Sequence, residues 1–436
     1  SGTASGFGAT GETSWDTTVK TTGTFTATAG VGYFLNTTGG TITVNLPVGA
    51  AGSSVAMVDY AGTWDSNAVT VAPNGSEKIG GIAASATLST EGQSVTFVYI
   101  DGIQGWVNVL DSTSNVIGAT YIVATGGTPC SGAIVCTNYK THTFTGPGTF
   151  CVSSVSNCAA NNLVSYVVVG AGGGSGNSGG GGGGAGGFRE VVSPSAPYTG
   201  SPLDGYPSAP NRITVTATGY PIAIGSGGTA GTGVKAPAGG VASFSTITGA
   251  GGGGGGGGGQ CGATLDAGGS GGGGRANQSN PGGAGNTPST TPSQGFAGGT
   301  GGTGTPGTGG GGGGGASAVG ANGGTPGNAR DGGNGGAGVT SEITASPVAY
   351  AGGGGGGTDT GTPTPGTPGT GGTGGPGGGG AGGIGNSGTG PTTGVAGGCN
   401  TGGGAGGGTN APGASPNTEQ GNIGGSGIVI IRYKFQ

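Results

Sequence analysis

The sequence is poor in charge, with ten lysines and arginines and fifteen aspartates and glutamates in 436 residues. Charged residues make up only 6% of the chain, and its formal net charge is −5. A nucleic-acid-binding protein needs a basic face to contact phosphates, and this composition provides none. We therefore expect no nucleic-acid partner.

Long hydrophobic runs are also missing. The longest, GIVIIRY near the C-terminus, is far shorter than the ~20 apolar residues of a membrane span, so we expect no membrane insertion. The sequence begins SGTASGFGATG without a methionine. We expect residues 1–20 to form a linker or an incomplete N-terminal segment.

Residues that could perform acid–base catalysis are scarce. His142 is the only histidine, and it lies in KTHTF, a predicted strand with no nucleophile and acid beside it. The motif G-x-S-x-G occurs at 176–180 and 268–272, but glycine fills these positions by composition and no helix follows. Seven acidic residues in 171–436 cannot supply a calcium-binding repeat. We expect no enzyme activity, no cofactor and no metal site.

The first four of the six cysteines fall into two close pairs, whose spacings of six and seven residues do not match zinc knuckles. The six cysteines are Cys130, Cys136, Cys151, Cys158, Cys261 and Cys399. Cys130–Cys136 and Cys151–Cys158 are candidates for two local disulfides, and Cys261–Cys399 is a candidate for a long-range disulfide. If these bonds form, the protein works outside a reducing cytosol.

Residues 21–111 have the pattern of a β domain. Short alternating or β-branched runs such as TITVNLP and QSVTFVYIDG are separated by Gly, Asn, Pro or Asp every eight to twelve residues. That spacing predicts an all-β, sandwich or barrel-like module with almost no α-helix. We expect residues 112–140 to be a connector that carries the first cysteine pair.

Glycine dominates the rest of the chain: of 126 glycines, 101 lie in residues 171–436. Such a composition usually gives disorder. However, the apolar stretches Val167–Val169 and Ile428–Ile431 bracket the glycine-rich region at its two ends. We expect both stretches to lie in one apolar sheet, so that the two ends of a domain spanning 141–436 close together.

Glycine runs could be ordered as left-handed helices with three residues per turn. Such helices rise ~3.1 Å per residue, so the run 171–187 would span about 50 Å. Without Cβ atoms, neighbouring helices can approach closely and hydrogen-bond to one another. Each bond contributes only ~1 kcal/mol, against ~1–2 kcal/mol of backbone entropy per residue. We therefore predict a lattice of many tightly packed polyglycine helices, with apolar β-strands at its edge.

Several stretches resemble known phage modules. HTFTGPGTF, SYVVVGAGGGSGNSGGGGGGAGGFRE and GGSGIVIIRY resemble the glycine-rich domain at the ends of tailed-phage tail fibres, over about residues 137–436. GYFLNTTGGTITVNLPVGAAGSSVAMVDYAGTW and VTFVYIDGIQGW resemble a module of structural and tail-fibre proteins from phages of aquatic bacteria. The resemblance implies a polyglycine sandwich whose distal loops touch the host surface, and adsorption rather than catalysis.

The resemblance also implies an extracellular virion fibre, assembled as a homotrimer or other fibre with further virion proteins. Its N-terminal domain would serve attachment or trimerisation, and its partner would be a host cell-surface glycan or outer-membrane protein. The alternative is a purely structural, self-assembling appendage filament without receptor binding. The candidate receptor contacts are the loop residues Tyr198, Asp204, Tyr206, Arg212 and Asp359. For the tyrosines, the alternative is that they cover the sides of the glycine lattice.

Overall fold

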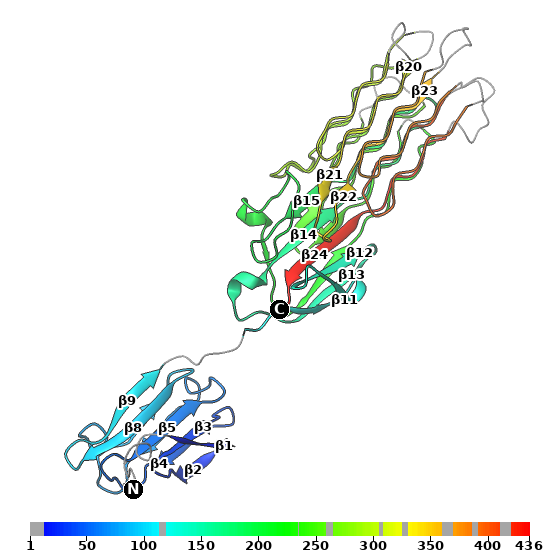
Figure 1. Ribbon diagram of the computed structural model, residues 1–436. Helices are drawn as coiled ribbons and strands as arrows, with labels where there is room; N and C mark the ends of the chain where they lie inside the picture. Colours follow the sequence, from blue (N-terminus) through cyan, green and yellow to red (C-terminus); the bar gives the residue numbers. More distant parts are fainter. Residues whose placement is uncertain are drawn as a thin grey trace, which may run out of the picture. The chain divides into compact units, whose positions relative to one another are not determined.

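The computed structural model describes residues 13–112, 119–233, 235–258, 265–304, 308–324, 330–359, 369–385, 391–409 and 420–436. The chain divides into two compact units, Ser1–Gly118 and Ala119–Gln436 (Figure 1). Among the described residues, helical structure is confined to two 3-10 turns, η1 (Ala159–Asn162) and η2 (Ala209–Asn211). The predicted all-β fold class is therefore confirmed.

The N-terminal unit is a two-sheet sandwich. Its strands are β1 (Ser14–Lys20), β2 (Gly23–Thr26), β3 (Val31–Leu35), β4 (Ile42–Asn45), β5 (Ser54–Asp59), β6 (Val69–Ala72), β7 (Ala86–Leu88), β8 (Ser94–Asp101) and β9 (Gly105–Ser112). One sheet has the order β1-β3-β5-β8-β9 and the other β2-β4-β6-β7. Neither sheet closes into a barrel among the described residues.

The first six strands of this unit form successive coils. β1, β3 and β5 are parallel to one another in one sheet, and β2, β4 and β6 are parallel in the other. β1 lies inside the stretch 1–20 that the sequence predicted as a linker, so the ordered unit begins earlier than expected. Alternate residues of each strand point inward and fill the core with side chains such as Leu35, Val55 and Trp106, all fully buried.

The second unit contains the remaining strands. They are β10 (Val123–Thr125), β11 (Thr128–Val135), β12 (Tyr139–Phe144), β13 (Gly148–Ser154), β14 (Leu163–Val169), β15 (Phe188–Val191), β16 (Ile213–Thr214), β17 (Gly219–Ala223), β18 (Ala242–Phe244), β19 (Ile247–Gly249), β20 (Thr308–Gly309), β21 (Val339–Ser341), β22 (Val348–Tyr350), β23 (Thr358–Asp359) and β24 (Ile428–Lys434). One sheet has the order β10-β13-β17-β18-β19, and another β11-β12-β24-β14-β15. β10 pairs with β13, and β11 pairs with β12. The region 119–140 is therefore part of the second unit, whereas the sequence predicted that residues 112–140 are a connector.

The two ends of the glycine-rich region meet in one sheet, as predicted. β14 and β24 are antiparallel neighbours, with Val167 opposite Ile430 and Val169 opposite Ile428. Both strands are buried on both faces: Val168 belongs to one apolar cluster and Val167 to a second one on the opposite face. This explains why both strands are continuous apolar runs rather than alternating ones.

The glycine runs form a lattice of short antiparallel segments rather than long helices. The run 171–187 folds back on itself at residues 177–179. The backbone N–H of Gly173 donates to the carbonyl of Gly184, and that of Gly176 donates to the carbonyl of Gly181, so the two arms lie side by side. The prediction that this run spans about 50 Å is therefore wrong. Each arm has about eight residues and spans roughly 25 Å at the rise of a three-residue helix.

The segment 180–187 shows how the lattice is held together. Its amides follow a period of three: residues 180, 183 and 186 donate to the segment 402–408, residues 181, 184 and 187 to 250–256, and residues 182 and 185 to 311–314. Its carbonyls accept from three further segments, 170–176, 270–273 and 354–357. All eight amides and seven of the eight carbonyls, those other than that of Gly186, thus have a lateral partner among the described residues, as burial requires. Six segments surround the central one.

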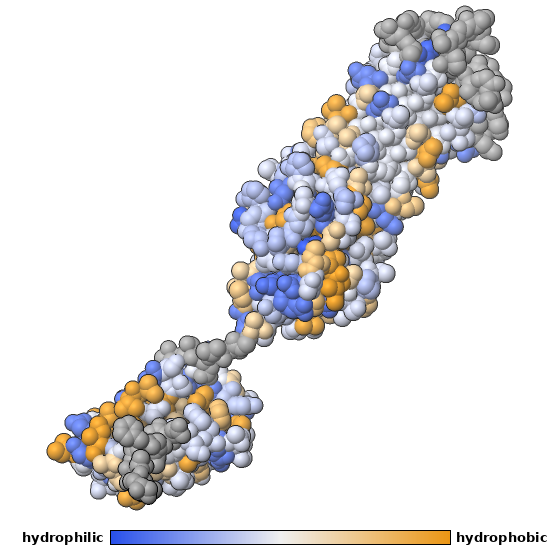
Figure 2. All heavy atoms as spheres, in the orientation of Figure 1, coloured by the Kyte–Doolittle hydropathy of each residue, from blue (hydrophilic) through white to orange (hydrophobic). Residues whose placement is uncertain are grey.

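Glycine is required here because the neighbouring backbones occupy the space of a side chain. A Cβ atom on Gly182 would overlap the carbonyl oxygen of Gly354, and one on Gly181 would overlap that of Gly273. Figure 2 shows the lattice surface as mostly pale, with isolated apolar residues. The lattice therefore has little apolar surface of its own to bury, and the strand sheets at its base supply the apolar cores.

Candidate functional site

The lattice runs from the sheet of β14 and β24 to a far end marked by β20 and β23 (Figure 1). A polar cluster closes this end. Asn277 donates its backbone N–H to the hydroxyl of Thr308 (2.8 Å) and its side-chain N–H to the carboxylate of Asp359 (2.5 Å). Asp359 is only 4% exposed. Its described contacts cap the lattice, and its predicted role in receptor binding stays a prediction.

The loop 193–211, which carries Tyr198, lies at the opposite, strand-bearing end of the lattice and is pinned by a buried carboxylate. Glu190 of β15 is 2% exposed. It accepts hydrogen bonds from the Tyr198 hydroxyl (3.0 Å), the Ser201 backbone N–H (2.7 Å) and the Ser341 hydroxyl (2.5 Å). Burial raises the pKa of the Glu190 carboxyl above its usual value, despite these bonds. Burial likewise raises the pKa of the Tyr198 hydroxyl. Tyr198 thus anchors the loop to the sheet.

Arg432 of β24 completes this buried polar cluster. It is 2% exposed, and its guanidinium lies over the rings of Tyr198 (5.4 Å) and Tyr139 (4.7 Å). It donates to the backbone carbonyls of Pro197 (2.9 Å) and Ile343 (3.1 Å). Sequence reasoning missed both charged residues of the cluster. The available signal was charge inside apolar strands: Arg189 and Glu190 in FREVV, and Arg432 in IVIIRY.

Three predicted contacts lie in and just after the same loop. Asp204 accepts from the backbone N–H groups of Val192 (3.0 Å) and Tyr206 (2.9 Å), so its carboxylate holds the loop shape. Arg212 donates to the carbonyl of Tyr206 (2.8 Å) and lies over its ring at 4.4 Å. Arg212 is exposed, whereas Tyr206 is half-buried and packs against the apolar core cluster of this unit. The structure thus brings Tyr206 and Arg212 together, far from Asp359 at the other end of the lattice.

His142 has a structural environment. It is fully buried on β12, with Nδ1 2.6 Å from the carbonyl of Gly126 and Nε2 3.0 Å from the hydroxyl of Tyr433. Its ring also contacts that of Phe150. Burial lowers the pKa of His142 below its usual value, the effect expected for a cation in an apolar core. These contacts make His142 a buried, hydrogen-bonded residue of strand β12.

The cysteines differ from the predicted pairing. Cys130, Cys136, Cys151, Cys158 and Cys399 are free and exposed, and Cys261 lies outside the described residues. The register places the two ends of β11 opposite Thr143 and Tyr139, four residues apart on β12. That corresponds to roughly 13 Å along the strand. Cys130 lies near one end of β11 and Cys136 just past the other, whereas a disulfide requires Cα atoms within ~7 Å.

None of the described residues form a group of three or more His, Cys, Asp or Glu side chains that could hold a metal ion. In the same part of the chain, no helix has the length and apolar character needed to cross a membrane.

Comparison with known proteins identifies the class of the second unit. Residues 143–434 match the family described as glycine-rich domain, and the chain belongs to this family. The match extends from β12 to the end of β24, so it includes the paired closing strands and the whole lattice between them. No curated protein matches the chain.

Proposed function

We propose that this chain is a non-catalytic virion fibre protein of the tail-fibre kind, whose glycine-rich lattice displays host-binding loops at its far end. The proposal rests on the sequence resemblance to phage tail fibres and on one structural observation. The segments return repeatedly to the same end of a lattice that is held by dense backbone hydrogen bonds. Loops carried on a rigid scaffold are where binding residues commonly lie.

The hydrogen bonds define this common end. Gly180 donates to Gly408 and accepts from Gly357, so two segment ends lie beside the fold-back at 177–179. At the same end, the N–H of Gly310 donates to the carbonyl of Gly357, and the N–H of Gly309 donates to the carbonyl of Gly324. Segments distant in sequence therefore end at the same level. These lateral bonds join backbone groups, so they place no demand of their own on the side chains of the connecting residues.

The predicted receptor contacts lie at two places in the chain: in or just after loop 193–211, and at Asp359. Loop 193–211 is tied to the sheet by Glu190, so it is suited to support the fold. The connection after Asp359 has the sequence TGTPTPGTP at 360–368, which lies outside the described residues. Its threonines and prolines offer hydroxyls and small apolar surfaces rather than charge. We propose a host glycan or outer-membrane protein as its partner.

The experiment replaces residues 360–368 and 410–419 with glycine–serine segments of equal length in the full chain. Binding of the fluorescently labelled protein to a panel of Gram-negative cells should fall at least tenfold. The matched control is the double variant Tyr206→Ala/Arg212→Ala at the strand-bearing end, which should bind as before. Loss of binding in the control alone would contradict display at the far end.

Electron microscopy separates this function from the alternative of a purely structural filament. We expect discrete fibres with one lattice tip per subunit, arranged as a closed oligomer. Open helical filaments, together with no binding to any cell of the panel, would favour the structural alternative.

A further inference from the structure

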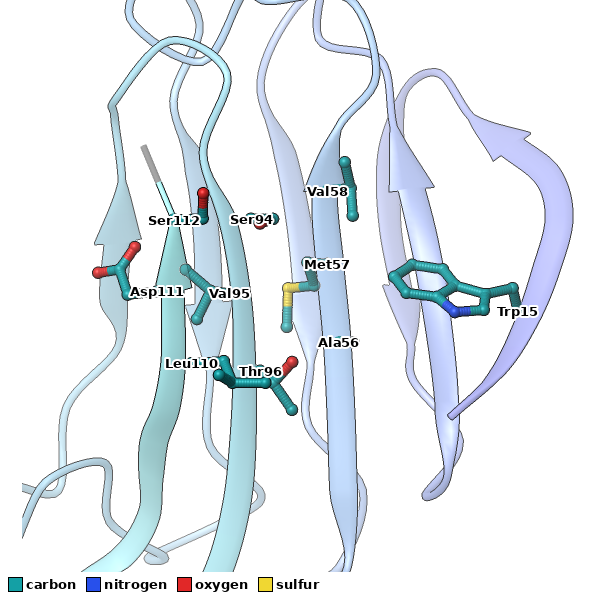
Figure 3. A pocket seen from close by; sticks show the side chains of 10 residues that line it. All are labelled: Trp15, Ala56, Met57, Val58, Ser94, Val95, Thr96, Leu110, Asp111 and Ser112. Atoms are coloured by element: carbon teal, nitrogen blue, oxygen red, sulfur yellow. The ribbon is translucent and has the colours of Figure 1, made fainter. Parts of the chain in front are cut away.

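A cavity of about 290 Å³ opens on the N-terminal unit, outside its core (Figure 3). Its lining includes Trp15, Ala56, Val58, Ser94, Thr96 and Leu110, which come from β1, β5, β8 and β9. The strands alternate: Val55 and Val95 belong to the core between the sheets, whereas their neighbours Ala56 and Ser94 do not. The cavity therefore lies on the outer face of the sheet β1-β3-β5-β8-β9.

The strand register explains why this face is hollow. Trp15, Gly32, Ala56, Thr96 and Leu110 stand opposite one another in a row across the five strands. The side chains at the two ends of this row, Trp15 and Leu110, are large, and those between them are small. Gly32 has no side chain because the ring of Trp15 occupies that space: a Cβ there would come within 2.6 Å of Trp15 Cε3.

The wall formed by Trp15 is fixed in place. Its ring packs against Phe34, with ring centroids 5.1 Å apart. The side chain is nevertheless 43% exposed, and Leu110 on the other side is 68% exposed. The Trp15 ring is thus held by its contact with Phe34, while a large part of the residue stays exposed beside the cavity. A preformed wall of this kind reduces the ordering cost of binding.

The polar groups of the cavity are mostly uncharged. Ser94 and Thr96, two residues apart on β8, are half-buried and lie on the same face of the sheet as Trp15. Among the described residues that line the cavity, Asp111 is the only ionisable one, and its carboxylate accepts a hydrogen bond from Gln93 (3.0 Å). The described part of the unit has seven acidic residues and two lysines. An anionic ligand is therefore disfavoured by charge.

From these observations we propose that the cavity binds the ring of a neutral sugar. A pyranose has an apolar face of C–H groups that can stack on an indole, and hydroxyls that can exchange hydrogen bonds with Ser94 and Thr96. The volume, close to the lower limit of ligand pockets, suits one ring rather than a large molecule. This site belongs to the N-terminal unit and the lattice tip to the second unit, so the test of one proposal does not depend on the other.

The test uses the intrinsic fluorescence of the full chain. Trp64 and Trp106 are fully buried, so acrylamide quenching of the exposed tryptophan signal reports on Trp15. We expect at least one of the methyl glycosides of glucose, galactose, mannose and N-acetylglucosamine to protect Trp15 from quenching, with saturation in the millimolar range. Ser94→Ala and Thr96→Val should each weaken this binding about fivefold, the loss of one hydrogen bond.

Two variants complete the design. Ala56→Leu fills the cavity and should abolish protection, whereas Val48→Ser, at a 71% exposed residue outside the cavity, should leave it unchanged. Circular dichroism shows whether each variant folds, and if Ala56→Leu does not, the two hydroxyl variants decide. No protection by any of the four glycosides at about 100 mM overturns the proposal. So does protection that both hydroxyl variants retain, or that depends on protein concentration, which would indicate a second copy in the cavity.

Discussion

Val168 lies directly opposite Val429 in the antiparallel pair β14–β24, so the first and last strands around the lattice are neighbours. The chain between them leaves this sheet, builds the lattice and returns to it. Lattice hydrogen bonds alone contribute ~1 kcal/mol each, which barely offsets the backbone entropy. We infer that the apolar contacts of this strand pair decide whether the lattice forms.

Shortening Ile430 tests this inference. Ile430 is 1% exposed and stands opposite Val167, so Ile430→Ala should lower the free energy of unfolding by about 2–5 kcal/mol through lost burial and a cavity. The control is Ile423→Ala, seven residues earlier and 56% exposed, with an expected change within about 0.5 kcal/mol. All three tryptophans lie in the other unit. Hydrogen–deuterium exchange of peptides from β14 is therefore the suitable measurement, and equal effects of the two variants would contradict the inference.

A single methyl group in the lattice should be more harmful than its size suggests. Gly182→Ala places a Cβ against the carbonyl oxygen of Gly354, and six segments surround this position, so the neighbours have little room to move. We expect a loss of at least about 3 kcal/mol, at the upper end for overpacked sites. Gly146→Ala is the control, because a Cβ there has no atom within 4 Å. Denaturation midpoints that coincide for the two variants would show that the lattice can expand.

The buried Glu190 makes the stability of the second unit depend on pH. Because the folded-state pKa of this carboxyl is raised above 4.5, its contribution to stability is fully present below pH 4.5 and is lost as pH rises through the folded pKa. Glu190→Gln keeps the shape and removes the charge. We expect its stability relative to the wild type to increase from pH 4.5 to pH 8, measured by exchange at each pH. Glu342→Gln, a half-buried carboxylate in the same unit, corrects for the general loss of charge.

The free cysteines predict a simple chemical result. Five thiols are exposed in the structure, so the native protein, purified without reductant under anaerobic conditions, should react rapidly with a thiol reagent at five or more sites. The predicted disulfides Cys130–Cys136 and Cys151–Cys158 would instead leave at most two cysteines, Cys261 and Cys399, able to react with the reagent. Mass spectrometry of the labelled peptides distinguishes the two results and also shows the state of Cys261.

How far the sequence predicts this protein depends on whether side chains mark the feature. The closing pair of strands was predictable because Val167–Val169 and Ile428–Ile431 are unbroken apolar runs. The fold-back within 171–187 was not, because consecutive glycines carry no side-chain pattern that distinguishes one long helix from two short ones. Its only marker is the pair Asn177–Ser178, and Ser178 indeed adopts a positive φ of 53°.

The polar clusters escaped prediction for a different reason. Glu190 and Arg432 are far apart in sequence, so no local motif links them. Tyr198 joins them, through a hydrogen bond to one and a ring contact to the other. Only the pairing of β14 with both β15 and β24 brings them together. Such a cluster depends on topology, which composition and spacing do not reveal.

The period of three in the lateral bonds of the lattice has a consequence for how such a chain can change in length. A segment shifted by three residues presents the same sequence of amides to the same neighbours, whereas a shift of one or two turns every amide toward a different neighbour. Within the segments, insertions and deletions should therefore be accepted in multiples of three. In the connections they should be accepted at any length, so that new tips can arise on an unchanged frame.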